Sequence, residues 1–137
     1  MDGGSQSWAK SEESVRETAD NIAGLLNEEN ADFVSIQEAD SDSTRTYHVD
    51  ETKLLRQNLP QYYNVSACCF DSPFLFWPIW QPHGESTSNL MTLSKYLPKN
   101  NAIRRQFPVD NSFTKILDYD RCYSVVRYPT SNGKELV

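Results

Sequence analysis

A glutamate at the end of a short apolar segment is the first residue of this sequence that could do chemistry. Residues Phe33 to Ile36 are mostly apolar and favour β structure, and Gln37 and Glu38 follow them directly. Such a segment predicts an inner strand of a sheet with both faces covered. Because α/β sheets place their ligands at the C-terminal ends of strands, we expect Glu38 to face a binding site.

The polar segment 39–48 follows Glu38, and we expect it to be a loop that lines the same cleft. Arg45 could contact a phosphate through charge-assisted hydrogen bonds, and Tyr47 could bind the substrate beside it. His48 could hydrogen-bond a phosphoryl oxygen or orient Glu38. An ordinary polar surface loop accounts for the same residues without any site.

Asn89 is a further candidate substrate-binding residue. It opens a predicted strand over residues 89–94, so its side chain could point into the cleft. An Asn at the start of a strand is also typical of a turn. Both interpretations remain open from the sequence.

Two helices are predicted to support these residues. The first covers about 11–27, where apolar residues recur at helical spacing and form one stripe: Val15, Ala19, Ile22 and Leu26. Its cap is Ser14, in a capping-box pattern with Glu17, or alternatively Ser11. The second covers 50–59, begins at the cap Asp50 and is stopped by Pro60.

Further strands are predicted over 62–70, 102–107 and 121–128, and Asn132-Gly133 predicts a type I′ hairpin turn after the last of them. A helix followed by a strand indicates an α/β or α+β arrangement. The segment 72–83 contains three prolines, two tryptophans and two phenylalanines, which exclude a regular helix and disfavour a central strand. We expect a loop, either buried by its own aromatic side chains or forming a wall of the cleft.

The composition of the 137 residues fits one folded domain, with 38% hydrophobic residues and frequent aromatic ones. The net charge of −6 disfavours non-specific binding to nucleic acid through charge alone. Three cysteines without a CxxC spacing predict reduced thiols rather than a disulfide framework or a zinc site. No stretch approaches the length of a membrane span, and the first residues lack the apolar region of a signal peptide, so we expect a cytoplasmic location.

Several segments, taken in order, resemble the endonuclease/exonuclease/phosphatase superfamily. The segment from Asp32 to Glu38 resembles the family's strand that ends in Gln-Glu, and Ser88 to Tyr96 resembles its strand with Leu-Ser-Arg/Lys-Tyr. Residues 102–108 and 121–137 resemble the strand and the hairpin that follow, and 43–50 resembles a bacterial subgroup. The resemblance extends from about residue 11 to residue 137.

The resemblance implies a partial DNase I-like β-sandwich flanked by helices. It also implies a magnesium-dependent hydrolase in which Glu38 binds the metal. The substrate of the full-length parent would be a phosphate ester: a nucleic acid, a phospholipid or an inositol phosphate. His48 is the tentative catalytic residue, with Arg45, Tyr47 and Asn89 as substrate contacts.

The sequence also departs from the family. The family's first strand, with its Asn ligand, is not found before the first helix, and the later Asn, Asp-x-Asn and Asp-His motifs are not found either. We therefore expect residues 1–137 to be the front part of one such domain, with little or no activity alone, so that its status as an enzyme stays open. Unpaired strand edges could let it self-associate. The alternative is a non-catalytic binding module that uses the aromatic segment 72–83.

Overall fold

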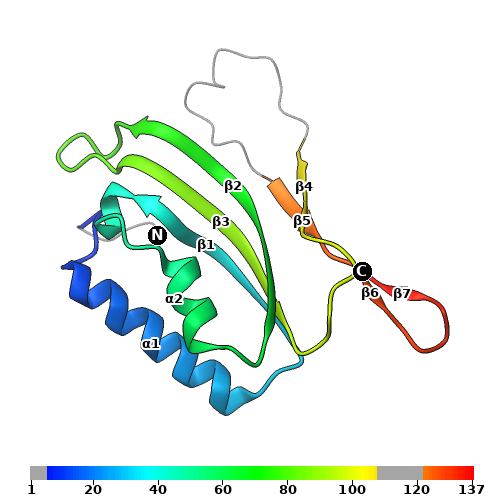
Figure 1. Ribbon diagram of the computed structural model, residues 1–137. Coiled ribbons are helices and arrows are strands. Elements are labelled where there is room, and N and C mark those ends of the chain that lie inside the picture. Colours follow the sequence, from blue (N-terminus) through cyan, green and yellow to red (C-terminus); the bar gives the residue numbers. More distant parts are fainter. Residues whose placement is uncertain (1–5, 108–121) are drawn as a thin grey trace.

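The computed structural model describes residues 6–107 and 122–137, which form an α+β fold, as the sequence predicts. Its main sheet is antiparallel and has the order β1-β3-β2. The strands are β1 (Phe33–Ser43), β2 (Tyr63–Leu75) and β3 (Gly84–Ser94). Two helices, α1 (Glu12–Glu29) and α2 (Glu51–Asn58), lie together on one side of this sheet (Figure 1). The DNase I-like arrangement of two packed sheets stays a prediction.

Both helices begin where a side chain caps them. The hydroxyl of Ser11 accepts a hydrogen bond from the Ser14 N–H, and the Ser14 hydroxyl accepts one from the Ser11 N–H, both at 3.1 Å. The cap of α1 is therefore Ser11, the alternative that the sequence offered. Asp50 caps α2 by accepting from the Lys53 N–H at 2.8 Å.

The buried face of α1 differs slightly from the predicted stripe. Val15, Ala19 and Ala23 are buried, whereas Ile22 is 37% exposed. Ala23 follows Ala19 by four residues and so continues the buried row more directly than Ile22, which is rotated toward solvent. Small alanines on this face allow α1 to lie close to the rest of the core.

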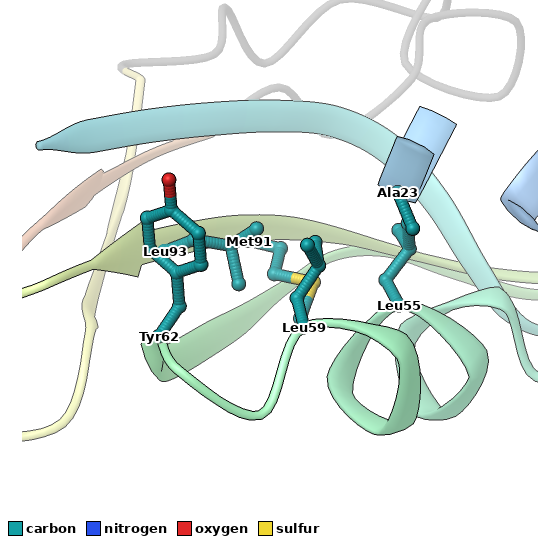
Figure 2. Close-up of a cluster of buried hydrophobic side chains, with 6 residues drawn as sticks. All are labelled: Ala23, Leu55, Leu59, Tyr62, Met91 and Leu93. Atoms are coloured by element: carbon teal, nitrogen blue, oxygen red, sulfur yellow. The ribbon is translucent and has the colours of Figure 1, made fainter. Parts of the chain in front are cut away.

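That core fills the space between the helices and the sheet. Met91 and Leu93 of β3 are fully buried against Leu55 of α2 and Leu59, the residue that follows α2, and Tyr62 closes one end of the cluster (Figure 2). The Tyr62 hydroxyl donates to the Ala31 carbonyl at 2.8 Å. Alternate residues of β3 thus supply the centre of the core, as expected for a sheet with one face covered.

Strand β1 corrects two predictions. It does not end at Glu38 but continues to Ser43, so residues 39–43 are strand and not loop. The reason is backbone pairing: Ala39 faces Asn89, and Ser43 faces Ser86. Within the described residues β1 is also an edge strand, and β3, not β1, is the inner strand. A single turn of 3-10 helix, η1 (Thr44–Thr46), follows β1.

A second group of strands follows the main sheet. β4 (Ile103–Gln106) pairs with β5 (Cys122–Val125), and β6 (Tyr128–Pro129) pairs with β7 (Glu135–Leu136). Val126 and Tyr128 pack on Val65 of β2 and form a second, smaller cluster. The beginning of the predicted strand 121–128, at residue 121, lies outside the described residues.

The predicted hairpin turn is present but of another type. Of the Asn-Gly pair only Gly133 has a positive φ, 78°, whereas a type I′ turn needs two such residues. The Gly133 N–H donates to the Thr130 carbonyl at 3.1 Å, and the Thr130 N–H donates to the Lys134 carbonyl at 3.0 Å. This is a three-residue hairpin loop that ends in a glycine bulge.

The aromatic segment is partly strand. β2 extends to Leu75, and Pro73 lies where the pairing of β2 with β3 is interrupted, between Ser72 and Leu75. The loop proper, residues 76–83, exposes its large side chains, with Ile79 72% and Trp80 71% accessible. The expectation that this segment buries its own aromatic residues is therefore wrong. No helix among the described residues is long and apolar enough to span a membrane.

Candidate functional site

Glu38 lies in a β-bulge of the edge strand β1. Ile36 faces Met91 and Ala39 faces Asn89, so two residues, Gln37 and Glu38, oppose Leu90 alone. The side chain of Glu38 is exposed and its φ is 57°. A positive φ is unfavourable for a residue with a Cβ, and bulges re-aim side chains near functional sites. The structure thus holds the Glu38 carboxylate in a strained, solvent-facing position.

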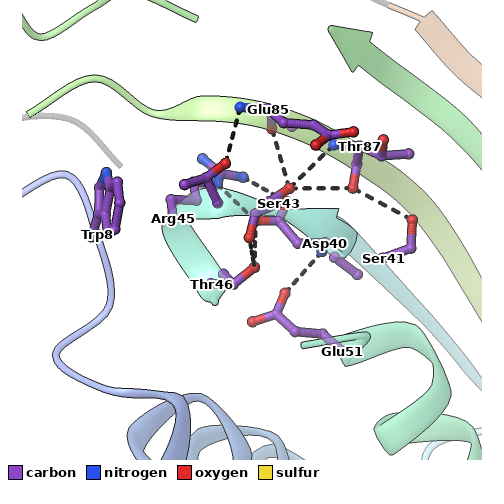
Figure 3. Close-up of polar contacts among 12 residues, drawn as sticks. Trp8, Asp40, Ser41, Ser43, Arg45, Thr46, Glu51, Glu85 and Thr87 are labelled. Carbon is purple, nitrogen blue, oxygen red and sulfur yellow. Dashed lines mark hydrogen bonds and ion pairs between the residues drawn. The ribbon is translucent and has the colours of Figure 1, made fainter. Parts of the chain in front are cut away.

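Beside the bulge, Asp40 and Arg45 form a buried ion pair. The Arg45 guanidinium donates from Nε to Oδ2 of Asp40 at 2.7 Å and from Nη2 to Oδ1 at 2.8 Å. The side chain of Asp40 is 1% exposed and that of Arg45 13%. Such a two-bonded contact is the strongest form of an arginine–carboxylate pair. Figure 3 shows the pair between the end of β1 and η1.

A second carboxylate completes the support of this pair. Glu51, the first residue of α2, accepts the Asp40 backbone N–H at 2.8 Å. Burial raises the pKa of Glu51, and the charge of Asp40 adds to the rise, while the hydrogen bond from the Asp40 N–H and the charge of Arg45 oppose it. Asp40 is thus held at its side chain and at its backbone.

Three carboxylates act on the charge of the Arg45 guanidinium. Burial alone would lower the pKa of Arg45, but the hydrogen bond and the charge of Asp40, with the charges of Glu38 and Glu51, raise it above its ordinary value. Arg45 therefore remains a cation beside the bulge. The expected contact of Arg45 with a phosphate would have to share the guanidinium with Asp40.

His48 pairs with Asp42, which lies near the end of β1. Its Nδ1 lies 2.5 Å from Oδ1 of Asp42, and both side chains are about half exposed, 53% and 56%. Tyr47 and His48 both have positive φ, 56° and 59°. With Nδ1 held by a carboxylate, Nε2 is the ring nitrogen that remains to take or give a proton.

The other two predicted substrate residues contact the chain itself. The Tyr47 hydroxyl donates to the Ala9 carbonyl at 3.2 Å, and its ring packs edge-on against Trp8 at 6.0 Å. Asn89 is buried, and its Nδ2 donates to the Ala39 carbonyl at 3.3 Å and to the Ser41 hydroxyl at 2.9 Å. Asn89 lies well inside β3, so it is not a turn residue but a bridge to the bulged part of β1.

The carboxylate of Glu38 is a suitable ligand for a hard cation, but one carboxylate alone does not make a metal site. Magnesium prefers oxygen ligands, usually one or two carboxylates with water and substrate. Within residues 6–107 and 122–137 there is no group of three His, Cys, Asp or Glu side chains that could hold a metal. Asp40, the neighbouring carboxylate, is bonded to Arg45. Further ligands would have to come from outside the described part of the chain.

Sequence reasoning missed the partners rather than the candidates. Asp40 holds Arg45, Asp42 holds His48, and Glu51 holds the main chain of Asp40. Because the segment 39–43 was predicted to be a loop, nothing indicated which side chains the strand would place together.

No protein-family model matches this chain, and the comparisons with curated proteins and with solved structures give no match either.

Proposed function

We propose that this chain carries part of the site of a magnesium-dependent phosphoester hydrolase of the endonuclease/exonuclease/phosphatase type, with Glu38 as a metal ligand. The observation that carries the proposal is the bulge in β1, which holds Glu38 exposed at a φ of 57°. Strain of this kind costs about 1–3 kcal/mol and is concentrated at functional sites. The cation would neutralise charge that develops on the phosphoryl oxygens.

The neighbouring side chains have matching roles in this proposal. Arg45 keeps a positive charge beside the bulge, which favours an anionic substrate there. Asp42 holds Nδ1 of His48, so that Nε2 can accept a proton from an attacking water. Because the remaining ligands are not among the described residues, we expect little or no activity from this chain alone.

The test is hydrolysis of bis(p-nitrophenyl) phosphate with Mg²⁺ by this chain and by the longest form that its gene encodes. Glu38→Ala and His48→Ala should each remove most of the longer form's activity, whereas Glu13→Ala, a change of an exposed carboxylate on α1, should not. An inert longer form, or one indifferent to Glu38→Ala, contradicts the proposal. In that case β1 carries a structural bulge and no metal ligand.

A second candidate function is a non-catalytic interaction module, favoured by the exposed loop 76–83. The rings of Trp77 and Trp80 pack with their centroids 5.7 Å apart. Their side chains are 53% and 71% exposed, and Ile79, between them in sequence, is also exposed. No Asp, Glu, Lys or Arg occurs in residues 72–82. Exposed apolar patches with tryptophan are typical of interaction surfaces, including uncharged lipid surfaces.

The loop is also held in place, which supports a preformed surface. The Trp8 indole N–H donates to the Pro82 carbonyl at 2.7 Å, and the Ser7 hydroxyl donates to the Gln81 carbonyl at 2.6 Å. Phosphatidylcholine vesicles should shift the tryptophan fluorescence to the blue and sediment the protein. Ile79→Ser with Trp80→Ser should abolish the sedimentation, and Leu97→Ser, a change of an exposed leucine elsewhere, should not. Absence of sedimentation of the unchanged protein contradicts an uncharged lipid surface as the partner of this loop.

A further inference from the structure

Two cysteines distant in sequence meet where the second group of strands contacts the main sheet. Cys69 belongs to β2 and Cys122 begins β5. The Cys69 thiol donates to the carbonyl oxygen of Cys122 at 3.9 Å, and the two thiols are close enough to interact electrostatically. Both are free thiols, Cys122 buried and Cys69 half-buried.

Cys69 lies in a bulge of β2, whereas the adjacent Cys68 is paired with β3. Cys68 faces Asn89 and Phe70 faces Ser88, so Cys69 is the extra residue of the interrupted ladder. Cys68 is exposed, and its thiol is directed to the Phe70 carbonyl at 3.4 Å. Of the two adjacent cysteines only Cys69 has a contact with Cys122 that the structure records, and this selects the pair.

Arg104 of β4 adds a positive charge at the same place. Its Nη2 donates to the Cys69 carbonyl oxygen at 3.5 Å, and its charge acts on the Cys122 thiol. Burial raises the pKa of Cys122 to about 11, and the charge of Arg104 opposes that rise. A cation beside a thiol favours the thiolate, which is the nucleophile in disulfide exchange.

We propose that Cys69 and Cys122 form a reversible disulfide by exchange with a small disulfide such as oxidised glutathione. The half-buried Cys69 loses its proton and attacks one glutathione sulfur, forming a mixed disulfide and releasing one glutathione thiolate. Cys122 then loses its proton and attacks the sulfur of Cys69, which releases the second glutathione. Two protein thiols are oxidised by two electrons, and one oxidised glutathione is reduced to two thiols.

The bond would connect β2 of the main sheet covalently to β5. Among the described residues, further contacts between the second group of strands and the main sheet include Val126 and Tyr128 packing on Val65, the Tyr128 ring on Phe33, and Arg104 on the Cys69 carbonyl. A cross-link across 53 residues restricts the unfolded chain strongly. The oxidised protein should therefore unfold at a higher temperature than the reduced protein.

The test is incubation with oxidised glutathione, alkylation of the remaining thiols and mass analysis of peptides. The unchanged protein and Cys68→Ser, the matched control, should both yield a Cys69–Cys122 peptide and a higher Tm. Cys122→Ala should stop at a glutathione adduct on Cys69. A Cys68–Cys122 link, a persistent adduct on Cys69 of the unchanged protein, or three unreacted thiols would each overturn the proposal. The thiols of urea-unfolded protein serve as the reference for full reactivity.

Discussion

Asp40 shows how a single side chain holds the candidate site together. Its carboxylate is 1% exposed and depends on Arg45 for its charge balance. Asp40→Asn should lower the free energy of unfolding by about 3–5 kcal/mol, because it leaves the Arg45 cation without its counter-charge. Urea unfolding measures this loss. The double variant Asp40→Leu with Arg45→Met should lose less than the sum of its two single changes; a loss equal to that sum would mean that the two residues do not act as a pair.

Glu38 should be a residue at which stability and function conflict. Its φ of 57° is unfavourable for glutamate but ordinary for glycine. Glu38→Gly should therefore leave the free energy of unfolding unchanged or raise it by up to about 1 kcal/mol, while Glu38→Val should lower it by about 1–3 kcal/mol. Thermal unfolding of both variants measures the difference. A Gly variant less stable than the Val variant would show that the bulge relaxes in solution.

Glu51 should give the stability a specific pH dependence. Burial raises its pKa in the folded protein above the ordinary value of about 4.3. Its contribution to stability is therefore complete below that ordinary value and is lost as the pH rises through the raised pKa. Glu51→Gln removes this loss, since its amide oxygen can still accept the Asp40 N–H.

Urea unfolding of both proteins between pH 4 and 8, a range set by that ordinary pKa, measures the effect. The stability of Glu51→Gln relative to the unchanged protein should rise with pH and level off above the raised pKa. A difference that falls with pH, or does not change, contradicts the assignment.

At the scale of elements, β3 begins where a glycine is required. Gly84 has a φ of 71°, and a Cβ there would lie 2.7 Å from Oγ1 and 2.8 Å from Cβ of Thr44 in η1. Gly84→Ala should lower the free energy of unfolding by about 1–3 kcal/mol, because both the backbone and Thr44 must shift. Gly133→Ala is the matched control: it has a similar φ but open space, so it should cost less. Equal losses in thermal unfolding would exclude the Thr44 clash.

The helices could be predicted from the sequence because their signals are local. Asp50 caps α2 as expected, whereas α1 is capped by Ser11, the alternative cap, in a capping box with Ser14 and not by the predicted box of Ser14 with Glu17. The extent of β1 could not be predicted in this way. Residues 39–43 are polar and are strand only because β3 pairs with them, a contact between segments about 45 residues apart. Strand structure depends on such partners more than on intrinsic preference.

The dependence of strands on their pairing partners also explains why the candidate site residues could be predicted but their partners could not. Glu38 and His48 could be chosen by their residue types and position after an apolar segment. Their partners could not, because the bulge that re-aims Glu38 and the strand that brings Asp42 to His48 are products of pairing. Arg45 was predicted to face a phosphate, yet the structure gives its guanidinium a partner within β1. Residue type indicates chemistry, but tertiary pairing decides which groups are already engaged.

At the scale of the molecule, two clusters of buried side chains share no residue. Leu93 is fully buried in the cluster beneath the helices, and Val126 belongs to the smaller cluster on β2. Leu93→Ala should lower the free energy of global unfolding by about 2–5 kcal/mol. Val126→Ala removes less apolar surface and should cost about 1–2 kcal/mol.

Hydrogen exchange can show whether the two clusters unfold as one unit. Because Val126 and Tyr128 pack on Val65 of β2, Val126→Ala should speed amide exchange in β5 and β6 and leave the amides of Met91 and Leu93 protected. Leu93→Ala should speed exchange throughout the described strands, since β3 pairs with both β1 and β2. If Val126→Ala accelerates β3 as much as β5, the chain is one cooperative unit, and the contact between β2 and β5 is stronger than its few buried side chains indicate.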